Sequence, residues 1–374
     1  MTSLFLWKNF WTLTVTGLTN GAMYALVALG YTLVYGILRL INFAHSEVFL
    51  LGTFGSIMAA TWILRIPQTR DGKYPYEHGL ALVVVLIFLL VVAMICSAAT
   101  ALVIERTAYR PLRGAGDKAG AIGMSFLTAF VVSLLFSENT KVNVVIAAIT
   151  TFPLSILYLR LFKRGRQAPR LAFLISAIGA STAISEAVAT WGPKTRNQYF
   201  PPRVLQKSVL FQFFDTDVRI DQLIVFVGAL LMMVALSMFV GKTRLGRGMR
   251  AVAQDPETAR IMGVNIDLVI LVTFLLGGLM AGGAGMMFTL AREQTRFDAG
   301  FVLGVKAFTA AVLGGIGNLK GALIGGLLLG MAENYGAGAF GGQWTDVISF
   351  VVLLVVLMFR PTGLLGETLG RARA

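Results

Sequence analysis

The chain alternates between long apolar runs and short charged or turn-rich breaks over its whole length of 374 residues. A helix needs roughly 18 or more apolar residues to cross about 30 Å of hydrocarbon, and runs of this length recur throughout. The pattern predicts an all-α polytopic membrane protein with about 10 to 11 transmembrane helices in a single domain, residues 1–374. The predicted spans lie near 11–37, 43–64, 79–105, 119–137, 142–162, 171–191, 221–241, 267–291, 301–316, 320–338 and 345–360.

Composition agrees with this class. Hydrophobic residues make up 56% of the chain and charged residues only 13%, about half the share of an ordinary soluble domain. The net charge of +14 comes from 32 Lys and Arg residues that are spread over the connectors. This spread favours the positive-inside pattern of a membrane protein over nucleic-acid binding. The connectors that hold more of the basic residues, among them the loop at 242–266, are predicted to be cytoplasmic together with the C-terminus.

Residues suited to catalysis or to metal binding are scarce. Cys96 is the one cysteine, and His45 and His78 are the two histidines, so no cluster with metal-ligand spacing exists. "GKT" at 241–243 ends like a phosphate-binding loop, but Leu236 stands where that motif needs a glycine. No nucleophile, base and orienting third group can be assembled from water-exposed residues. We therefore expect a chain that is not an enzyme and that binds neither a metal nor a cofactor itself.

One short stretch, "RAVAQDPETARIMGVN" from Arg250 to Asn265, is far more polar than its surroundings. Asp255 followed by Pro256 is a favourable helix start, with Asp as the N-cap and Pro in the first helical position. Gly263 is placed to stop the helix after about two turns. The sequence thus predicts a short surface helix between two spans. Such a helix suits docking into a groove on a soluble partner, and a helix that merely lies on the lipid is the alternative.

The same stretch carries a motif, because Glu257, Ala259 and Gly263 match the E-x-A-x-x-x-G pattern of the coupling loop in ABC importer permeases. Further segments resemble, in order, the landmarks of the LivH-type permease subunits of branched-chain amino acid ABC importers. These segments are "NGAMYALVALGYTLVYGILRLINFAH", "ERTAYRPLR", "LISAIGAS", "AVLGGIGNLKGALIGGLLLGMAE" and "FRPTGLLG". The resemblance covers nearly everything outside about 114–166.

This resemblance implies the transmembrane permease subunit of an ATP-driven importer for leucine, isoleucine and valine. It implies two ATP-binding subunits that hold ATP and Mg, a second related permease in a heterodimer, and a periplasmic substrate-binding protein. It also implies a multi-pass location in the lipid bilayer of a bacterial inner membrane. Coupling to the ATPase subunits would run through the loop at 242–266, at Asp255, Glu257, Ala259, Arg260 and Gly263.

Residues 114–166 depart from the resemblance, because they separate "AYRPLR" from "PRLAFLISAIGAS", which lie a few residues apart in the family. The segment holds two predicted spans joined by a short turn, so it would begin and end on the cytoplasmic side. We interpret it as an inserted two-helix hairpin. Lipid-facing padding is one reading of this hairpin, and contact with a partner is the other.

Polar residues within the spans indicate surfaces that avoid lipid. On the first span, Asn20, Tyr24 and Tyr31 fall at helical spacings together with other polar residues. Either they line a translocation path, as Glu186 near the outer end of its own span would, or they pack against other helices. Lys306 and Glu333 lie about equally far from the turn at 317–320, so they could form an ion pair. The alternatives are that both reach the interface by snorkelling, or that Glu186 is the partner.

Glycines at four-residue spacing predict close helix packing. The main set is Gly317, Gly321 and Gly325, and Gly278 with Gly282 forms another pair. Packing within the chain and a subunit interface are both consistent with these patterns.

Two other functions are consistent with the same spans. Urea or short-amide permeases look similar within the family. A proton-coupled secondary transporter, which needs no ATPase, would use Glu186 or Glu333 as its titrating group. The E-x-A-x-x-x-G motif argues against the second, because such a transporter has no use for a coupling helix.

Overall fold

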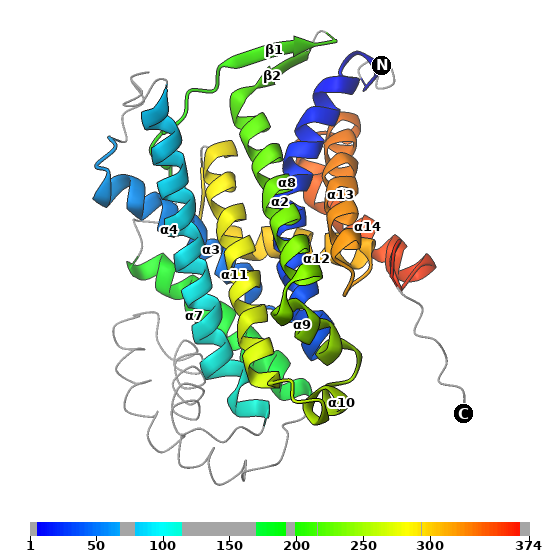
Figure 1. Ribbon diagram of the computed structural model, residues 1–374. Helices are drawn as coiled ribbons and strands as arrows, with labels where there is room; N and C mark the ends of the chain where they lie inside the picture. Colours follow the sequence, from blue (N-terminus) through cyan, green and yellow to red (C-terminus); the bar gives the residue numbers. More distant parts are fainter. Residues whose placement is uncertain are drawn as a thin grey trace, which may run out of the picture.

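The computed structural model describes residues 6–67, 79–113, 170–191, 199–214, 216–292 and 294–366. The hairpin predicted at 114–166, with its two spans, lies outside these residues. Most of the described chain is helical (Figure 1). The membrane-length helices include α2 (Phe10–Leu38), α3 (His45–Met58) with η1 (Ala59–Ile63), α4 (Leu80–Ile104) with η2 (Glu105–Tyr109), α7 (Arg170–Trp191), α8 (Ile220–Lys242) and α11 (Ile266–Ala291), where η1 and η2 are π-helical turns.

The C-terminal part of the chain and the connectors supply the remaining elements. A two-stranded antiparallel hairpin precedes α8, and two short helices follow it. These elements are β1 (Val209–Phe213), β2 (Thr216–Arg219), α9 (Arg244–Gln254), α10 (Pro256–Ile261), α12 (Ala299–Gly314), α13 (Leu319–Phe340), α14 (Thr345–Phe359) and the short 3₁₀ turns η3 (Pro111–Arg113) and η4 (Gly342–Trp344).

Within the described residues, the number of spans is lower than the sequence predicted for them. Seven helices of the described residues are long and apolar enough to cross a membrane, or up to eight if α12 and α13 count together as one span. The two separate spans predicted at 301–316 and 320–338 are therefore wrong: α12 and α13 form a pair bent by 120°. Gly315 and Gly317 make this bend possible, because their φ angles of 105° and 99° lie in the region that favours glycine.

The C-terminal segment completes this bend. The backbone N–H of Leu364 donates to the carbonyl of Leu313 at 2.8 Å, and that of Leu365 donates to Gly314 at 3.0 Å. Asn318, the N-cap of α13, donates through its side chain to the carbonyl of Leu365 at 2.9 Å. Carbonyls at the end of a helix have no partner within the helix, so the segment after α14 satisfies polar groups that lipid could not.

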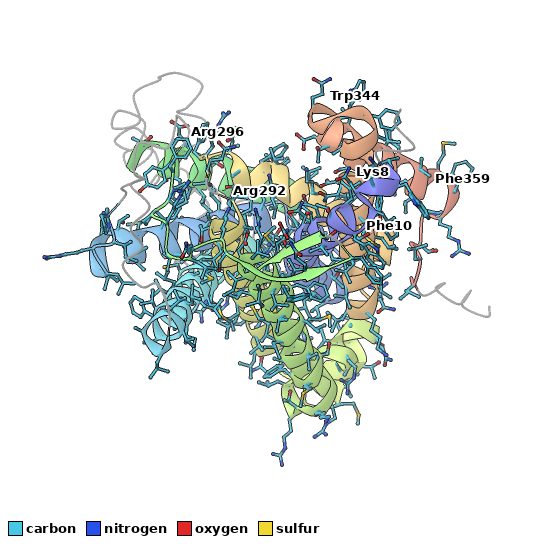
Figure 2. The ribbon with its side chains drawn as sticks, turned by 90° about the horizontal axis from the view of Figure 1, so that it is seen from above. Lys8, Phe10, Arg292, Arg296, Trp344 and Phe359 are labelled. Atoms are coloured by element: carbon cyan, nitrogen blue, oxygen red, sulfur yellow. The ribbon has the colours of Figure 1, made fainter. Side chains whose placement is uncertain are left out.

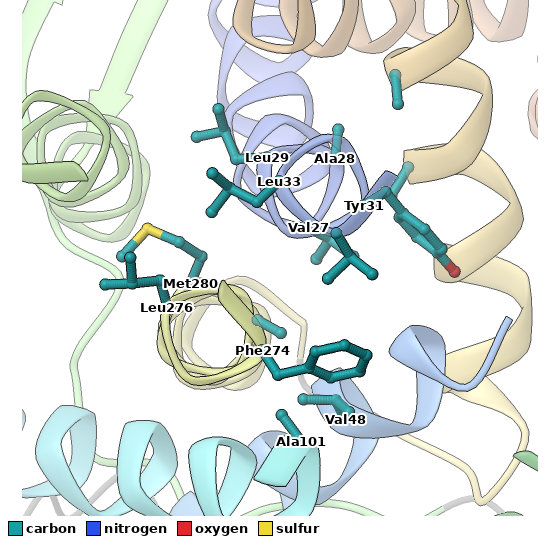
Figure 3. Packing of buried hydrophobic residues seen from close by; sticks show 14 of the residues in the cluster. Val27, Ala28, Leu29, Tyr31, Leu33, Val48, Ala101, Phe274, Leu276 and Met280 are labelled. Carbon is teal, nitrogen blue, oxygen red and sulfur yellow. The ribbon is translucent and has the colours of Figure 1, made fainter. Parts of the chain in front are cut away.

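Helices α2 and α11 form the centre of the bundle, and α4, α8 and α14 lie at its periphery (Figure 1). In the most apolar 18-residue stretch of each helix, 83% is buried in α2 and 78% in α11, against 28% in the α4 span and 22% in α8. Figure 3 shows the core between them, where Leu29 and Leu33 of α2 belong to one buried cluster with Phe274 and Met280 of α11. The exposed apolar faces of the peripheral helices suit contact with lipid.

Small residues bring the central helices close together, because lipid provides no hydrophobic force between them. A Cβ added at Gly326 of α13 would lie 2.6 Å from Ala25 of α2, and one added at Gly278 of α11 would lie 2.8 Å from Ala98 of α4. Gly321 and Gly325 contact Gly314 of α12 in the same way. Gly317 corrects the prediction, since a Cβ there meets no atom within 4 Å: its role is the positive φ of the turn.

Candidate functional site

The candidate residues fall at two opposite ends of the bundle. Figure 1 shows β1, β2 and the N-terminus at one end, and α9 and α10 at the other. We call these the hairpin end and the α10 end.

At the α10 end, Asp255 begins the short helix. Its Oδ1 accepts hydrogen bonds from the backbone N–H groups of Glu257 at 2.9 Å and Thr258 at 3.3 Å, and Pro256 stands in the first turn. The Thr258 hydroxyl donates to the other oxygen, Oδ2. These hydrogen bonds, that of the Thr258 hydroxyl first, hold the pKa of Asp255 below its ordinary value because they favour the charged form. The helix start predicted from the sequence is confirmed.

The end of α10 explains the glycine of the motif. Gly263 has a φ of 84°, and an added Cβ would meet no atom within 4 Å, so backbone conformation and not space requires glycine. Its N–H donates to the carbonyl of Arg260 at 3.0 Å, and the N–H of Val264 donates to that of Ala259 at 3.0 Å. This pair of hydrogen bonds is the Schellman arrangement that ends many helices.

Ala259 anchors α10 to the bundle. It is 4% exposed and belongs to the buried cluster that contains Met249 and Val252 of α9. Glu257 and Arg260, in contrast, are exposed. The motif therefore has two parts: alanine and glycine fix the position and length of the helix, and its charged side chains point to water.

The surface around α10 combines apolar and basic groups. Ile261 and Met262, at the end of the helix, are 84% and 78% exposed. A cavity of about 370 Å³ opens between α9 and α11, and its lining includes Arg244, Arg247 and Leu268. Exposed apolar side chains beside a groove are typical of a surface that binds another protein.

Side-chain contacts connect this end to the membrane helices. Arg39, at the end of α2, donates to the carbonyl of Ala253 in α9 at 3.1 Å. Arg113 forms an ion pair with the buried Glu105 of η2 and another, at 3.6 Å, with Asp267 in the first turn of α11. A displacement of α9 or α10 would therefore act directly on the ends of α2 and α11, and the Arg113 ion pairs connect the end of α11 to the end of the α4 span.

At the hairpin end, a cavity of about 500 Å³ lies among α2, α8, α11, α12, α13 and α14. We call it the hairpin-end cavity. Its wall is polar, and six of its lining residues are acidic or basic. These are Arg219, Asp221, Arg292, Lys306, Glu333 and Asp346.

The structure brings Lys306 and Glu333 together on this wall. Lys306 Nζ lies 3.2 Å from Glu333 Oε1 and 2.8 Å from Asp346 Oδ1. The Glu333 side chain is 1% exposed, and it also accepts hydrogen bonds from the Ser349 hydroxyl and, at 2.7 Å, from the Tyr24 hydroxyl. A buried charge is tolerated when it is paired and hydrogen-bonded, and Glu333 meets both conditions.

The other polar residues predicted for the path separate in the structure. Asn20 lines the hairpin-end cavity, and Tyr24 reaches it through Glu333. The buried ring of Tyr31 instead packs edge-on against the ring of His45, with the two ring centroids 4.9 Å apart. Glu186 is half-buried on α7, and Lys306 takes its carboxylate partners from α13 and α14.

Sequence reasoning missed Asp346 and Arg292. Both stand at the end of an apolar run, where a charged residue looks like an ordinary interfacial group. Figure 2 looks down on the hairpin end and places Arg292 near the middle of the bundle. Their position on one wall depends on how α11, α12 and α14 pack, so spacing in the sequence gave no signal.

Over residues 13–357 the chain matches the family described as "Branched-chain amino acid transport system / permease component". It is 34% identical over 356 residues to the high-affinity branched-chain amino acid transport system permease protein BraD of Pseudomonas aeruginosa, covering 94% of each chain. It is also 34% identical over 354 residues to the permease protein LivH of the corresponding system in Escherichia coli, again covering 94% of each.

A more distant similarity covers only part of the chain. The autoinducer 2 import system permease protein LsrC of Yersinia enterocolitica is 33% identical over 137 residues, which are 35% of this chain. No solved structure matches the chain.

Proposed function

Because the chain belongs to the family of branched-chain amino acid transport permease components, we propose that it is the membrane subunit of an ATP-driven importer for leucine, isoleucine and valine. The match over nearly the whole chain to this family supports the permease role. In this role the chain forms the path and hydrolyses nothing, while separate subunits bind ATP and Mg.

In this proposal, ATP hydrolysis by a partner subunit acts on the permease at the α10 end. A cytoplasmic ATPase subunit docks on the exposed face of α10, where Glu257 and Arg260 point to water and Ile261 offers an apolar contact. Ala259 and the Gly263 cap keep the helix rigid, so that a movement of the ATPase reaches α9 and α11 and is not absorbed locally. This assigns the loop at 242–266 as the coupling loop and places it in the cytoplasm with the C-terminus.

The hairpin end then faces the periplasm and receives substrate from a binding protein. Asn20 and Tyr24 lie on the route between the hairpin-end cavity and the bundle centre. A second, related permease completes the membrane part, and two ATPase subunits drive it.

Two features of the hairpin end argue against the other functions. Glu333 is held by Lys306, Ser349 and Tyr24, so it is poorly placed to exchange a proton with water. The cavity wall carries six charged side chains, which neutral urea or a short amide does not need. A charged, zwitterionic substrate fits this wall better.

Uptake of labelled leucine into proteoliposomes tests the proposal, with this chain reconstituted together with its permease, ATPase and binding-protein partners. We expect uptake that needs ATP on the ATPase side and that is unchanged when the proton gradient is collapsed. Uptake that follows a proton gradient without ATP would overturn the importer assignment, and uptake of urea in place of leucine would overturn the substrate.

A further inference from the structure

The charges on the wall of the hairpin-end cavity are unevenly paired. Arg219 and Asp221 form a one-to-one ion pair at 3.0 Å. Lys306 faces two carboxylates, those of Glu333 and Asp346, so this group carries one formal negative charge in excess. The cavity therefore presents a wall region with an unbalanced negative charge.

Arg292 supplies the opposite charge. It lines the same cavity, and it has no ion-pair partner among the residues that the structure describes. One cavity thus holds an uncompensated guanidinium and an excess carboxylate.

The remaining hydrogen-bonding capacity points to the same two residues. Both oxygens of Glu333 are occupied, whereas the Asp346 side chain is 64% exposed and Arg292 is exposed. A further acceptor is Oδ1 of the buried Asp221, which has no hydrogen-bond donor among the described residues. A ligand that brings one cation and one anion would satisfy these groups together.

We infer that the hairpin-end cavity binds a zwitterionic α-amino acid, with its carboxylate on the guanidinium of Arg292 and its ammonium on the carboxylate of Asp346. The class of substrate rests on the proposed function, and the assignment of these residues goes beyond it. A planar guanidinium can bind a carboxylate through two parallel hydrogen bonds, which fixes the orientation of the ligand. Lys306, held by Glu333, positions Asp346 for the ammonium.

The same wall offers no apolar pocket that would recognise the side chain of the amino acid. Its uncharged lining residues are small or polar, such as Ala291, Ala337, Gly342 and Asn20, and none is a large apolar residue. Selective binding of a leucine side chain needs an apolar pocket. The cavity therefore discriminates amino acids from other solutes, and discrimination among amino acids takes place elsewhere in the transport cycle.

Equilibrium binding to the full chain in lipid nanodiscs tests this inference. The ligands are L-leucine, L-leucinamide, which lacks the carboxylate, and 4-methylpentanoate, which lacks the ammonium; L-alanine tests the side chain. Each truncated ligand should bind roughly tenfold or more weakly than leucine, because a hydrogen bond to a charged group is lost. L-alanine should bind within a factor of about three of leucine.

Variants assign each ligand group to its residue. Arg292→Gln should weaken the binding of leucine roughly tenfold and leave the affinity for leucinamide unchanged. Asp346→Asn should weaken the binding of leucine and leave the affinity for 4-methylpentanoate unchanged. Arg296→Gln is the matched control, because Arg296 pairs with Asp298 at 2.9 Å and lies outside the cavity lining. The comparison of ligands within one variant separates the assigned contact from a general loss of structure.

The outcomes separate this inference from the proposed function. Absence of leucine binding to the wild-type chain overturns the inference. Equal effects of Arg292→Gln on leucine and leucinamide do so as well, even where ATP-driven uptake is intact. If the reconstituted importer takes up no amino acid, the proposed function fails, while the binding data still decide what the cavity recognises.

Discussion

The ion pair between Lys306 and Glu333 should be measurable as a coupling free energy. Coulomb's law with an effective dielectric constant of about 20 gives roughly 5 kcal/mol for unit charges separated by their 3.2 Å. Asp346, at 2.8 Å, shares the charge of Lys306 and keeps it partly compensated when Glu333 is removed. Desolvation of both groups offsets a further part of this Coulomb energy, so we expect a coupling free energy of about 1 to 3 kcal/mol.

A double-mutant cycle measures this quantity. Glu333→Gln, Lys306→Met and the double variant are unfolded by SDS titration in mixed micelles, and the free energies of unfolding are compared. The cycle of Arg296→Gln with Asp298→Asn is the control, because these side chains are 50% and 42% exposed and should couple by less than about 1 kcal/mol. Additivity of the Lys306 and Glu333 substitutions within about 0.5 kcal/mol would refute the reasoning.

Three further predictions concern packing, hydrogen bonding and pH. Gly326→Val should lower stability by about 1 to 3 kcal/mol, because a Cβ there lies 2.6 Å from the backbone of α2; Gly241→Ala, with no atom within 4 Å, should be neutral in the same thermal unfolding assay. Tyr24→Phe should cost roughly 1.5 to 3 kcal/mol, because Glu333 loses a donor; an unchanged unfolding temperature would contradict this. Because folding lowers the pKa of Asp255, its charged cap stabilises α10 at pH values above the unfolded pKa, and this stabilisation is lost as the pH falls through the folded pKa. Amide protection in α10, measured by hydrogen exchange, should therefore persist down to pH 3.8 and decrease at lower pH. Loss of this protection already above pH 3.8 would contradict the cap.

Much of the fold could be predicted from local patterns in the sequence. The apolar runs predicted the helices of the described residues, because a lipid-facing or buried span must be apolar over its whole length. The start and end of α10 followed from Asp255, Pro256 and Gly263, because capping depends on side chains within a few residues of the helix.

Features that depend on packing were predicted less well. The turn predicted at 317–320 was expected to join two full spans, but Gly315 and Gly317 permit a bent pair instead. Counting residues from that turn placed Lys306 and Glu333 at similar depth, and the structure has them in contact. Asp346 and Arg292 reach the same wall from helices distant in sequence, so no local pattern could group them.

The most direct test of the account is ATP-driven leucine uptake by the reconstituted importer with Glu257→Lys, compared with wild type. The Glu257 side chain is exposed at the start of α10, and only the backbone N–H of this residue takes part in the cap, so the substitution leaves that hydrogen bond available. The account predicts normal assembly with the ATPase subunits and a loss of uptake, because charge reversal disturbs the coupling surface. Undiminished uptake by this variant would contradict a coupling role for α10.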